Sequence, residues 1–262
     1  MRYNLHTHTF RCHHATGEDR EYVEAAIQAG IKVLGFADHC PQFFPDTDYY
    51  SNFRMRPEEA EGYVKSLRRL QKEYENDIRI LVGFETEYYP KTYDNMIGFF
   101  SQLDLDYLIM GQHFIGNEYD DLTMYSSVER ESKRLLKRYI DQVLEGLQTG
   151  VFTYIAHPDI FNYQGDDDFY RKQMSGFLRE IKKLDIPIEF NLLGLKNGRD
   201  YPNPLFWQLA AEIGNRTVIG YDAHQPEALL DEDSYRRCRK ILSDLGITPI
   251  GLQEIEMKAP RA

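Results

Sequence analysis

The chain has 262 residues, of which 42% are hydrophobic and 28% are charged, a composition that supports a sizeable folded core and excludes wholesale disorder. Lys and Arg number 31 against 42 Asp and Glu, which gives a formal net charge of −11 at pH 7. A non-specific nucleic-acid binder usually carries the opposite sign, so nucleic acid is not an expected partner, whereas a small anionic substrate is compatible with this charge if bound divalent cations reverse the sign locally.

Short apolar runs alternate with longer amphipathic segments along the whole chain. In chain order the pattern predicts strand 3–5, helix 18–29, strand 31–37, helix 56–74, strand 78–84, helix 92–103, strand 107–110, helix 126–147, strand 152–156, helix 168–184, strand 186–191, helix 204–213, strand 217–221, helix 234–245 and strand 247–250. Gly30 is expected just past the end of the first helix, and Pro57 at the first position of the second. Ser126 followed by Glu129 has the pattern of a capping box and is expected to open the fourth helix.

About seven strand-then-helix units in one chain call for parallel strands with helices outside them. The pattern alone is compatible with a barrel and with an open doubly wound sheet. A dinucleotide site would need G-x-G-x-x-G after the first strand, but His-Thr-His follows it, so we favour a single-domain barrel over residues 1–262. Residues 40–55 form a long aromatic loop after the second strand, either a substrate loop over a site or an ordinary surface loop.

The cysteines and the N-terminus indicate the compartment. Three cysteines without a C-x-x-C pair favour neither a disulfide framework nor a zinc ribbon. The first ten residues lack the apolar run of a signal peptide, and the sequence has no run of about 18 apolar residues for a membrane span. We therefore expect a cytoplasmic protein that does not associate with membranes, and the sequence does not indicate its oligomeric state.

Residues that commonly bind metals stand where the predicted strands end. They are His6 and His8 after the first strand, His39, Glu85, His113 and His157 after later ones, and Asp222 with His224 near the C-terminus. His6 and His8 are two positions apart, so both side chains leave the same face of the extended chain. In a parallel barrel all these ends open on one rim, so residues more than 200 positions apart would meet in one pocket.

Imidazoles and carboxylates together suit Zn, Fe or Mn better than Ca or Mg. The set exceeds what one tetrahedral ion binds, so it indicates a multinuclear site, which supplies metal-bound hydroxide and clamps phosphoryl oxygens. One strand-end histidine alone is more often a hydrogen-bonded loop residue, but so many are hard to reconcile with independent structural roles. Of the neighbouring pair His13 and His14, we take only His14 as a candidate ligand, because neighbours on a loop rarely both coordinate one centre. Asp38 is expected behind the ligands or facing outward.

The opening HTHTFRCHHA, in which His14 follows His6 by eight positions, resembles the first motif of the polymerase and histidinol phosphatase (PHP) family. FADH, GFETE, GQH, AHPD and YDAH are similar to its later motifs, in order and across nearly the whole chain. Within the family the chain most resembles the stand-alone histidinol-phosphate phosphatases, because its length fits and no further domain is attached.

The resemblance implies a distorted seven-stranded (β/α)7 TIM-like barrel that holds three divalent ions. The implied ligands are His6, His8, Glu85 and Asp222 for the first ion, His14, His39 and His224 for the second, and Glu85, His113 and His157 for the third. The implied reaction is hydrolysis of histidinol phosphate to histidinol and phosphate, a step of histidine biosynthesis. A hydroxide held between the ions would attack phosphorus, so no protein nucleophile is needed.

Phosphate binding should recruit polar and cationic groups beside the metals. The candidates are Asn191, Lys196 and Arg199 after the sixth strand and Arg54 in the aromatic loop, and His13 or a metal-bound water is a candidate acid for the leaving group. Two alternatives stay open: a phosphoesterase of the same chemistry that acts on a nucleotide or phosphotyrosine, and a metal-binding protein without turnover. The complete ligand set argues against the second.

Overall fold

The computed structural model describes residues 2–44, 47–49, 51–120 and 123–260. Seven strands form one sheet in the order β1 (Tyr3–Asn4), β2 (Val33–His39), β3 (Arg79–Thr86), β4 (Tyr107–Met110), β7 (Tyr154–Ile155), β8 (Ile188–Asn191) and β9 (Thr217–Gly220), and all neighbours are parallel. A parallel bridge between Thr7 and Ala223 joins the two edges just beyond β1 and β9. The sheet is thus a nearly closed barrel, which confirms the predicted fold class.

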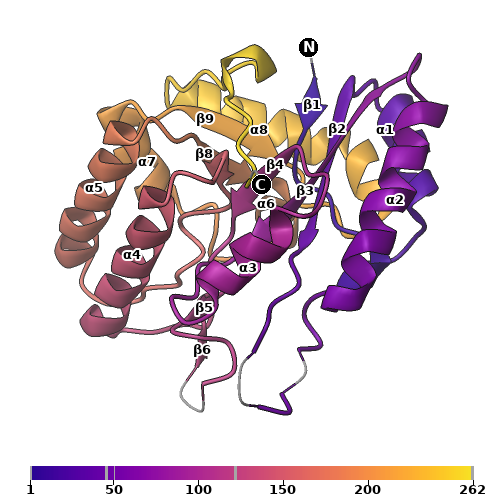
Figure 1. The fold of residues 1–262 in the computed structure, drawn as a ribbon. Coiled ribbons are helices and arrows are strands. Elements are labelled where there is room, and N and C mark those ends of the chain that lie inside the picture. The colour runs from indigo at the N-terminus through magenta and orange to yellow at the C-terminus, as the bar shows by residue number, and fades with distance from the viewer. Residues whose placement is uncertain (1, 45–46, 50, 121–122, 261–262) are drawn as a thin grey trace.

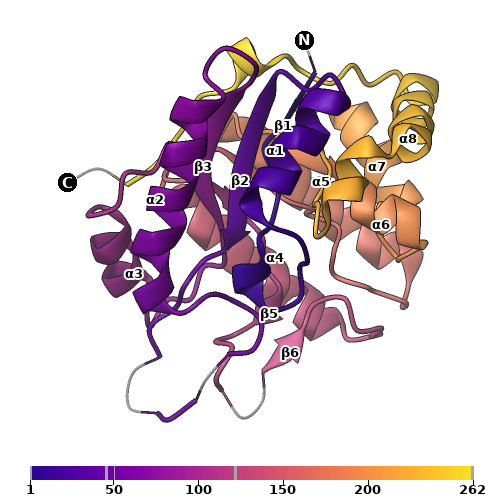
Figure 2. The same cartoon turned by 90° about the vertical axis from the view of Figure 1, so that its right-hand side faces the viewer.

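Helices surround the strands (Figures 1 and 2). They are α1 (Asp19–Gln28), α2 (Pro57–Glu73), α3 (Tyr93–Phe100), α4 (Lys133–Gln148), α5 (Asp167–Lys183), α6 (Leu192–Asn197), α7 (Pro204–Ile213) and α8 (Glu232–Asp244), with short 3-10 turns at Phe10–Cys12, Pro226–Leu230 and Leu252–Glu254. Pro57 occupies the first turn of α2, and Gly30 has the left-handed φ of 71° expected after α1. No helix in the described part of the chain is long and apolar enough to cross a membrane.

The strands are buried on both faces because one face meets the helices and the other lines the barrel interior. All seven residues of β2 are buried, for example. The interior is filled mainly by Leu5, Val33, Ala37, Leu81, Tyr107, Ile109, Tyr154, Ala156 and Val218, joined by Ile255 from the C-terminal segment. That segment covers the N-terminal ends of the strands, where Leu108 donates to the Lys258 carbonyl at 2.7 Å. The opposite rim is therefore the end at which a site can open.

The predicted last strand at 247–250 is not a strand. Ile250 donates one backbone hydrogen bond to the Thr217 carbonyl at 2.9 Å, but Ile247 donates to the Leu242 carbonyl at the end of α8 at 2.8 Å, so the start of the segment completes the helix end and does not pair with β9.

The region between β4 and α4 also differs from the prediction. Helix α4 begins at Lys133, where the Ser132 side chain accepts from Leu135 N, so Ser126 is not its cap. Ser126 is buried and donates instead to the Gln112 carbonyl at 3.0 Å. A two-stranded antiparallel hairpin precedes it, formed by β5 (Phe114–Ile115) and β6 (Met124–Tyr125). This hairpin and the loop before α2 project from the same end of the barrel (Figures 1 and 2).

Candidate metal centre

The nine predicted metal ligands lie together at the rim opposite the C-terminal segment. Seven of them are buried, His224 is partly buried and His14 is exposed. His39 ends β2 and is the register partner of Glu85 in β3, so the parallel pairing itself places these two side by side. The remaining ligands except His14 follow β1, β4, β7 and β9 within a few residues, which is why their side chains reach the same rim, and His14 comes just after the 3-10 turn Phe10–Cys12.

The carboxylate of Glu85 stands at the centre of the cluster. Its oxygens lie 2.8 Å from His157 Nε2, 3.1 Å from His39 Nδ1, and 3.5 Å from His6 Nε2 and from His113 Nε2. Although these nitrogens are close, none is oriented for a hydrogen bond to Glu85, so neither oxygen has a hydrogen-bond partner among the described residues. The Nδ1 atoms of His39 and His157 also lack one. Buried polar atoms are rarely left unpaired, so this arrangement fits a set of ligands built to bind cations.

A second group surrounds Asp222. Its Oδ1 lies 3.0 Å from His8 Nε2, 3.3 Å from His224 Nδ1 and 3.5 Å from His6 Nε2, and the Nε2 atoms of His6 and His8 are only 3.1 Å apart. Ligand atoms of His6, His8 and Asp222 all lie within 4.8 Å of one another, as do those of His6, Glu85 and His157. His6 therefore links the Asp222 group to the Glu85 group.

The third predicted group is looser. The ring of His14 lies 4.9 Å from that of His224 and 5.1 Å from that of His39, measured between centroids, and His39 and His224 are 6.0 Å apart. Ligand atoms of His8, His39 and His224 fall within 4.8 Å of one another, and so do those of Cys12, His14 and His224. The structure thus brings all nine residues together and places Cys12 next to them.

Three carboxylates hold the imidazoles from behind, and the sequence reasoning assigned no role to two of them, Glu189 and Glu87. Glu189 lies 2.9 Å from His6 Nδ1, and Glu87 lies 2.8 Å from His113 Nδ1. Asp38, expected behind the ligands or facing outward, is behind them, 3.4 Å from His8 Nδ1.

Such partners fix which ring nitrogen faces the metal and raise its basicity. One signal for Glu189 was available, because it is a charged residue inside the apolar strand IEFN.

Two glycines leave room for these carboxylates. A Cβ atom at Gly111 would lie 1.9 Å from Glu85 Oε1, and one at Gly220 would lie 2.0 Å from Glu189 Oε2. Either contact is far too short, so both positions need the absence of a side chain.

Backbone strain also marks this rim. His157 has a φ of 67° and Asp222 a φ of 51°, in the left-handed region that non-glycine residues rarely adopt. Such conformations cost about 1–3 kcal/mol each and cluster at functional sites.

Opposite charges in the cluster shift the pKa values of their neighbours. Burial opposes ionisation of Glu85, but the imidazoles of His113, His6 and others outweigh this and hold the carboxyl pKa well below its ordinary value. Burial also disfavours the charged form of His6, yet the carboxylates of Glu189 and Asp222 raise its pKa to about 10. For His224 burial dominates and lowers the pKa to about 3. The carboxylates are therefore ionised, and positive charge is stabilised where cations would bind.

A cavity of about 240 Å³ opens beside the cluster. It is lined by His14, His39, Phe53, His113, Tyr125, His157, Leu193, Arg199, Tyr201, Asp222 and His224. Arg199 is its cation, and its Nη1 donates to the Tyr201 hydroxyl at 2.6 Å.

The other candidates for substrate binding do not line this cavity. Asn191 is buried and donates to Asp222 Oδ2 at 3.1 Å, so it holds the carboxylate of a predicted ligand. Lys196 lies 3.3 Å from Asp231 and lines a neighbouring cavity. His13 is exposed and is not among the residues that line the metal-side cavity.

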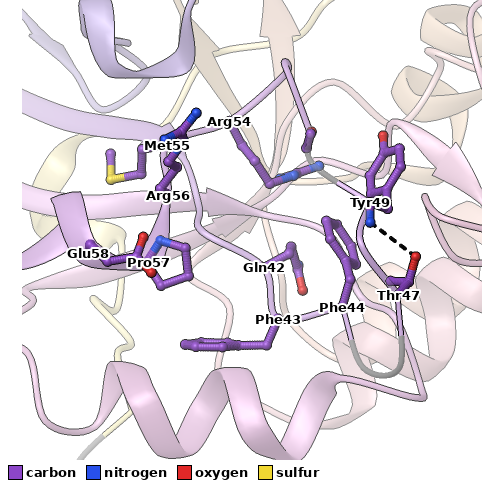
Figure 3. A pocket seen from close by; sticks show the side chains of 11 residues that line it. Gln42, Phe43, Phe44, Thr47, Tyr49, Arg54, Met55, Arg56, Pro57 and Glu58 are labelled. Carbon is purple, nitrogen blue, oxygen red and sulfur yellow. Dashed lines mark hydrogen bonds between the residues drawn. The ribbon is translucent and has the colours of Figure 1, made fainter.

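The expectation that Arg54 binds phosphate is corrected by its contacts. Its guanidinium is buried and donates to Glu87 at 2.8 and 3.0 Å, to Glu118 at 3.0 Å and to the Cys40 carbonyl at 3.1 Å. Arg54 borders a separate cavity of about 220 Å³ beside its own loop (Figure 3). The guanidinium N–H groups of Arg54 already donate to two buried carboxylates. Arg54 therefore holds Glu87, which in turn contacts His113, and does not face a substrate.

The aromatic loop covers the metal-side cavity through Phe53, whose ring centroid lies 4.3 Å from that of His39 and 5.1 Å from that of His14. This contact favours the substrate-loop interpretation. Positions 45, 46 and 50 of the loop lie outside the described residues.

Comparisons with known proteins agree with this geometry. A family model described as PHP domain matches residues 4–192. A protein named probable histidinol-phosphatase from Deinococcus radiodurans is 30% identical over 228 residues, which is 84% of this chain and 85% of the relative. The histidinol-phosphatase of Bacillus subtilis is 24% identical, and the match covers 84% of this chain and 92% of the relative.

A crystal structure of histidinol phosphate phosphatase from Lactococcus lactis subsp. lactis, complexed with Zn, L-histidinol and phosphate, matches with a TM-score of 0.74 at 19% identity. The match covers 99% of this chain and 97% of that chain. At this level of identity the likeness shows the common fold.

Proposed function

The chain belongs to the PHP domain family, and we propose that it is a metal-dependent phosphatase that converts histidinol phosphate and water into histidinol and phosphate. The observation that carries the proposal is the buried Glu85 carboxylate, which lacks hydrogen-bond partners while four imidazole nitrogens converge on it. Relatives named histidinol-phosphatase that match over 84% of the chain support the choice of substrate.

We assign three ions to the nine residues. The first takes His6, His8, Glu85 and Asp222, the second takes His14, His39 and His224, and the third takes Glu85, His113 and His157. Imidazole and carboxylate ligands of this kind suit Zn, Fe or Mn. The unpartnered oxygens of Glu85 support its role as a ligand shared by two ions.

When bound, such ions activate water at neutral pH and offset the charge on phosphoryl oxygens. The chain's own residues orient that chemistry. Glu189, Glu87 and Asp38 hold His6, His113 and His8 from behind. Arg199 faces the cavity and is the cation best placed to bind a phosphate oxygen, while its bond to Tyr201 limits the positions its guanidinium can take.

Phosphate release provides the test. Chelator-treated protein should hydrolyse no phosphate ester, and readdition of Zn, Mn or Fe should restore hydrolysis of histidinol phosphate. We expect kcat/KM for histidinol phosphate to exceed that for a nucleotide monophosphate or a phosphotyrosine peptide by at least about tenfold. Comparable values on all three substrates would refute the assigned substrate, and metal-loaded protein inert on the whole panel would refute the enzyme.

A further inference from the structure

Three aromatic side chains stand next to the metal centre without belonging to its ligands. Phe53 comes from the loop between β2 and α2, and Phe114 and Tyr125 are directly paired across the hairpin β5–β6. The ring of Phe114 lies 5.6 Å from that of Phe53 and 5.3 Å from that of Tyr125, nearly perpendicular to both. Phe53 and Tyr125 line the metal-side cavity, and Phe114 supports them. We call these three residues the aromatic wall.

The aromatic wall adjoins ligands assigned to two different ions. The Phe53 ring lies 5.1 Å from that of His113 and 4.3 Å from that of His39, and the Tyr125 ring lies 6.2 Å from that of His113 at an angle of 17°. The wall residues are only half-buried, so part of each ring remains accessible. An ester whose phosphoryl group lies on the metals would therefore place its alcohol part beside these rings.

Buried ion pairs fix the wall in this position. Ser51 and Arg54, which flank Phe53 closely, both donate to the buried carboxylate of Glu118. Glu118 belongs to the segment that follows β5, so it ties the loop to the hairpin. Arg54 also binds Glu87, the residue that holds His113. A surface held by buried partners on both sides of the ring is ordered before a ligand arrives, which reduces the entropy lost on binding.

We propose that the aromatic wall is the specificity surface for the alcohol part of the ester, and that it selects monoesters whose alcohol carries a flat ring. Aromatic rings whose centroids lie about 4.5–7 Å apart attract one another more strongly than the burial of their apolar surface alone would account for. The inference rests on the proposed function and deepens it, because histidinol is an amino alcohol that carries an imidazole ring.

The experiment compares two substrates. Histidinol phosphate carries the ring, whereas O-phosphoethanolamine keeps the phosphate and the amine but lacks it. The test variants are Phe53→Leu and Tyr125→Leu, and Tyr125→Phe keeps the ring while removing the hydroxyl. Phe43→Leu is the matched control, because Phe43 lies on the same loop but lines the other cavity (Figure 3).

We expect both leucine variants to lower the ratio of kcat/KM for histidinol phosphate to that for O-phosphoethanolamine by about threefold to tenfold, mainly through KM. Tyr125→Phe and Phe43→Leu should leave the ratio unchanged. Because both substrates need the same metals, metal loss lowers both rates and leaves the ratio as it was. Calorimetric titration of L-histidinol into the metal-loaded protein adds a readout that needs no turnover, and both leucine variants should weaken its binding.

An unchanged ratio together with an unchanged affinity for L-histidinol in both leucine variants would overturn the inference while leaving the phosphatase assignment intact. The reverse outcome is equally distinct. If the wild type hydrolyses no monoester but binds L-histidinol more tightly than both leucine variants do, the proposed function fails and the aromatic wall stands as a ring-binding surface.

Discussion

Replacing Arg54 by methionine separates two roles for this residue, a buried structural cation and a phosphate ligand. The substitution removes the cation that both Glu87 and Glu118 contact, and all three side chains are buried. Removing one partner of a buried ion pair costs about 3–5 kcal/mol, because it leaves an uncompensated charge behind. For a protein of this size each kcal/mol shifts the melting temperature by about 2–4 °C, so we expect Arg54→Met to lower it by about 6–20 °C.

The assay is thermal unfolding followed by circular dichroism, together with steady-state hydrolysis of histidinol phosphate. Arg20→Met is the matched control, because Arg20 makes a similar two-bond pair with Glu73 at 2.6 and 2.7 Å on the exposed surface. Exposed pairs contribute only about 0–1 kcal/mol, so the control should melt within about 4 °C of the wild type.

The structural reasoning about Arg54 would be refuted by a specific pattern. Arg54→Met would melt within the range of the Arg20→Met control and would raise KM for histidinol phosphate at least about tenfold with kcat unchanged. That result would indicate that Arg54 binds the phosphate of the substrate.

Three further predictions concern the metal centre and one helix end. Glu85→Ala should lose more metal per chain than His157→Ala, because we assign Glu85 to two ions and His157 to one; elemental analysis of the purified variants decides this, and equal metal content would count against sharing. Gly111→Ala should lower metal content and kcat, because its Cβ would lie 1.9 Å from Glu85 Oε1, and an alanine that keeps full metal content would contradict the close contact. Asp231 caps α8 by accepting from Ser234 N at 2.9 Å, so Asp231→Ala should cost about 1 kcal/mol at pH 7 in urea unfolding. Burial opposes ionisation of Asp231, but the hydrogen bonds from Ser234 outweigh this and lower its pKa. The capping contribution to stability is therefore complete above the ordinary pKa of 3.8 and is lost as the pH falls below it. A stability difference between variant and wild type that persists undiminished well below pH 3.8 would refute this link between protonation and capping.

The barrel and the meeting of the candidate ligands at one rim could be predicted because both depend on local sequence and one topological rule. All the candidate ligands except His14 follow or end an apolar run, as His39 ends VLGFADH and Glu85 ends ILVGFE. Alternating strands and helices make the strands parallel, and parallel strands open their carboxyl ends on one rim. Residues far apart in the chain could therefore be placed together without knowledge of any individual contact.

The partners of each side chain were decided only by the tertiary structure. Arg54 and Glu87 are 33 positions apart and His6 and Glu189 are 183 apart, so no periodicity reports that they meet. A cationic side chain in an aromatic loop reads equally well as a phosphate ligand or as half of a buried ion pair. The hairpin β5–β6 is equally invisible in the sequence, because two-residue strands carry too few positions to show alternation. Local sequence thus determined which residues could bind metals, whereas long-range packing decided which charges were already neutralised and which faced the cavity.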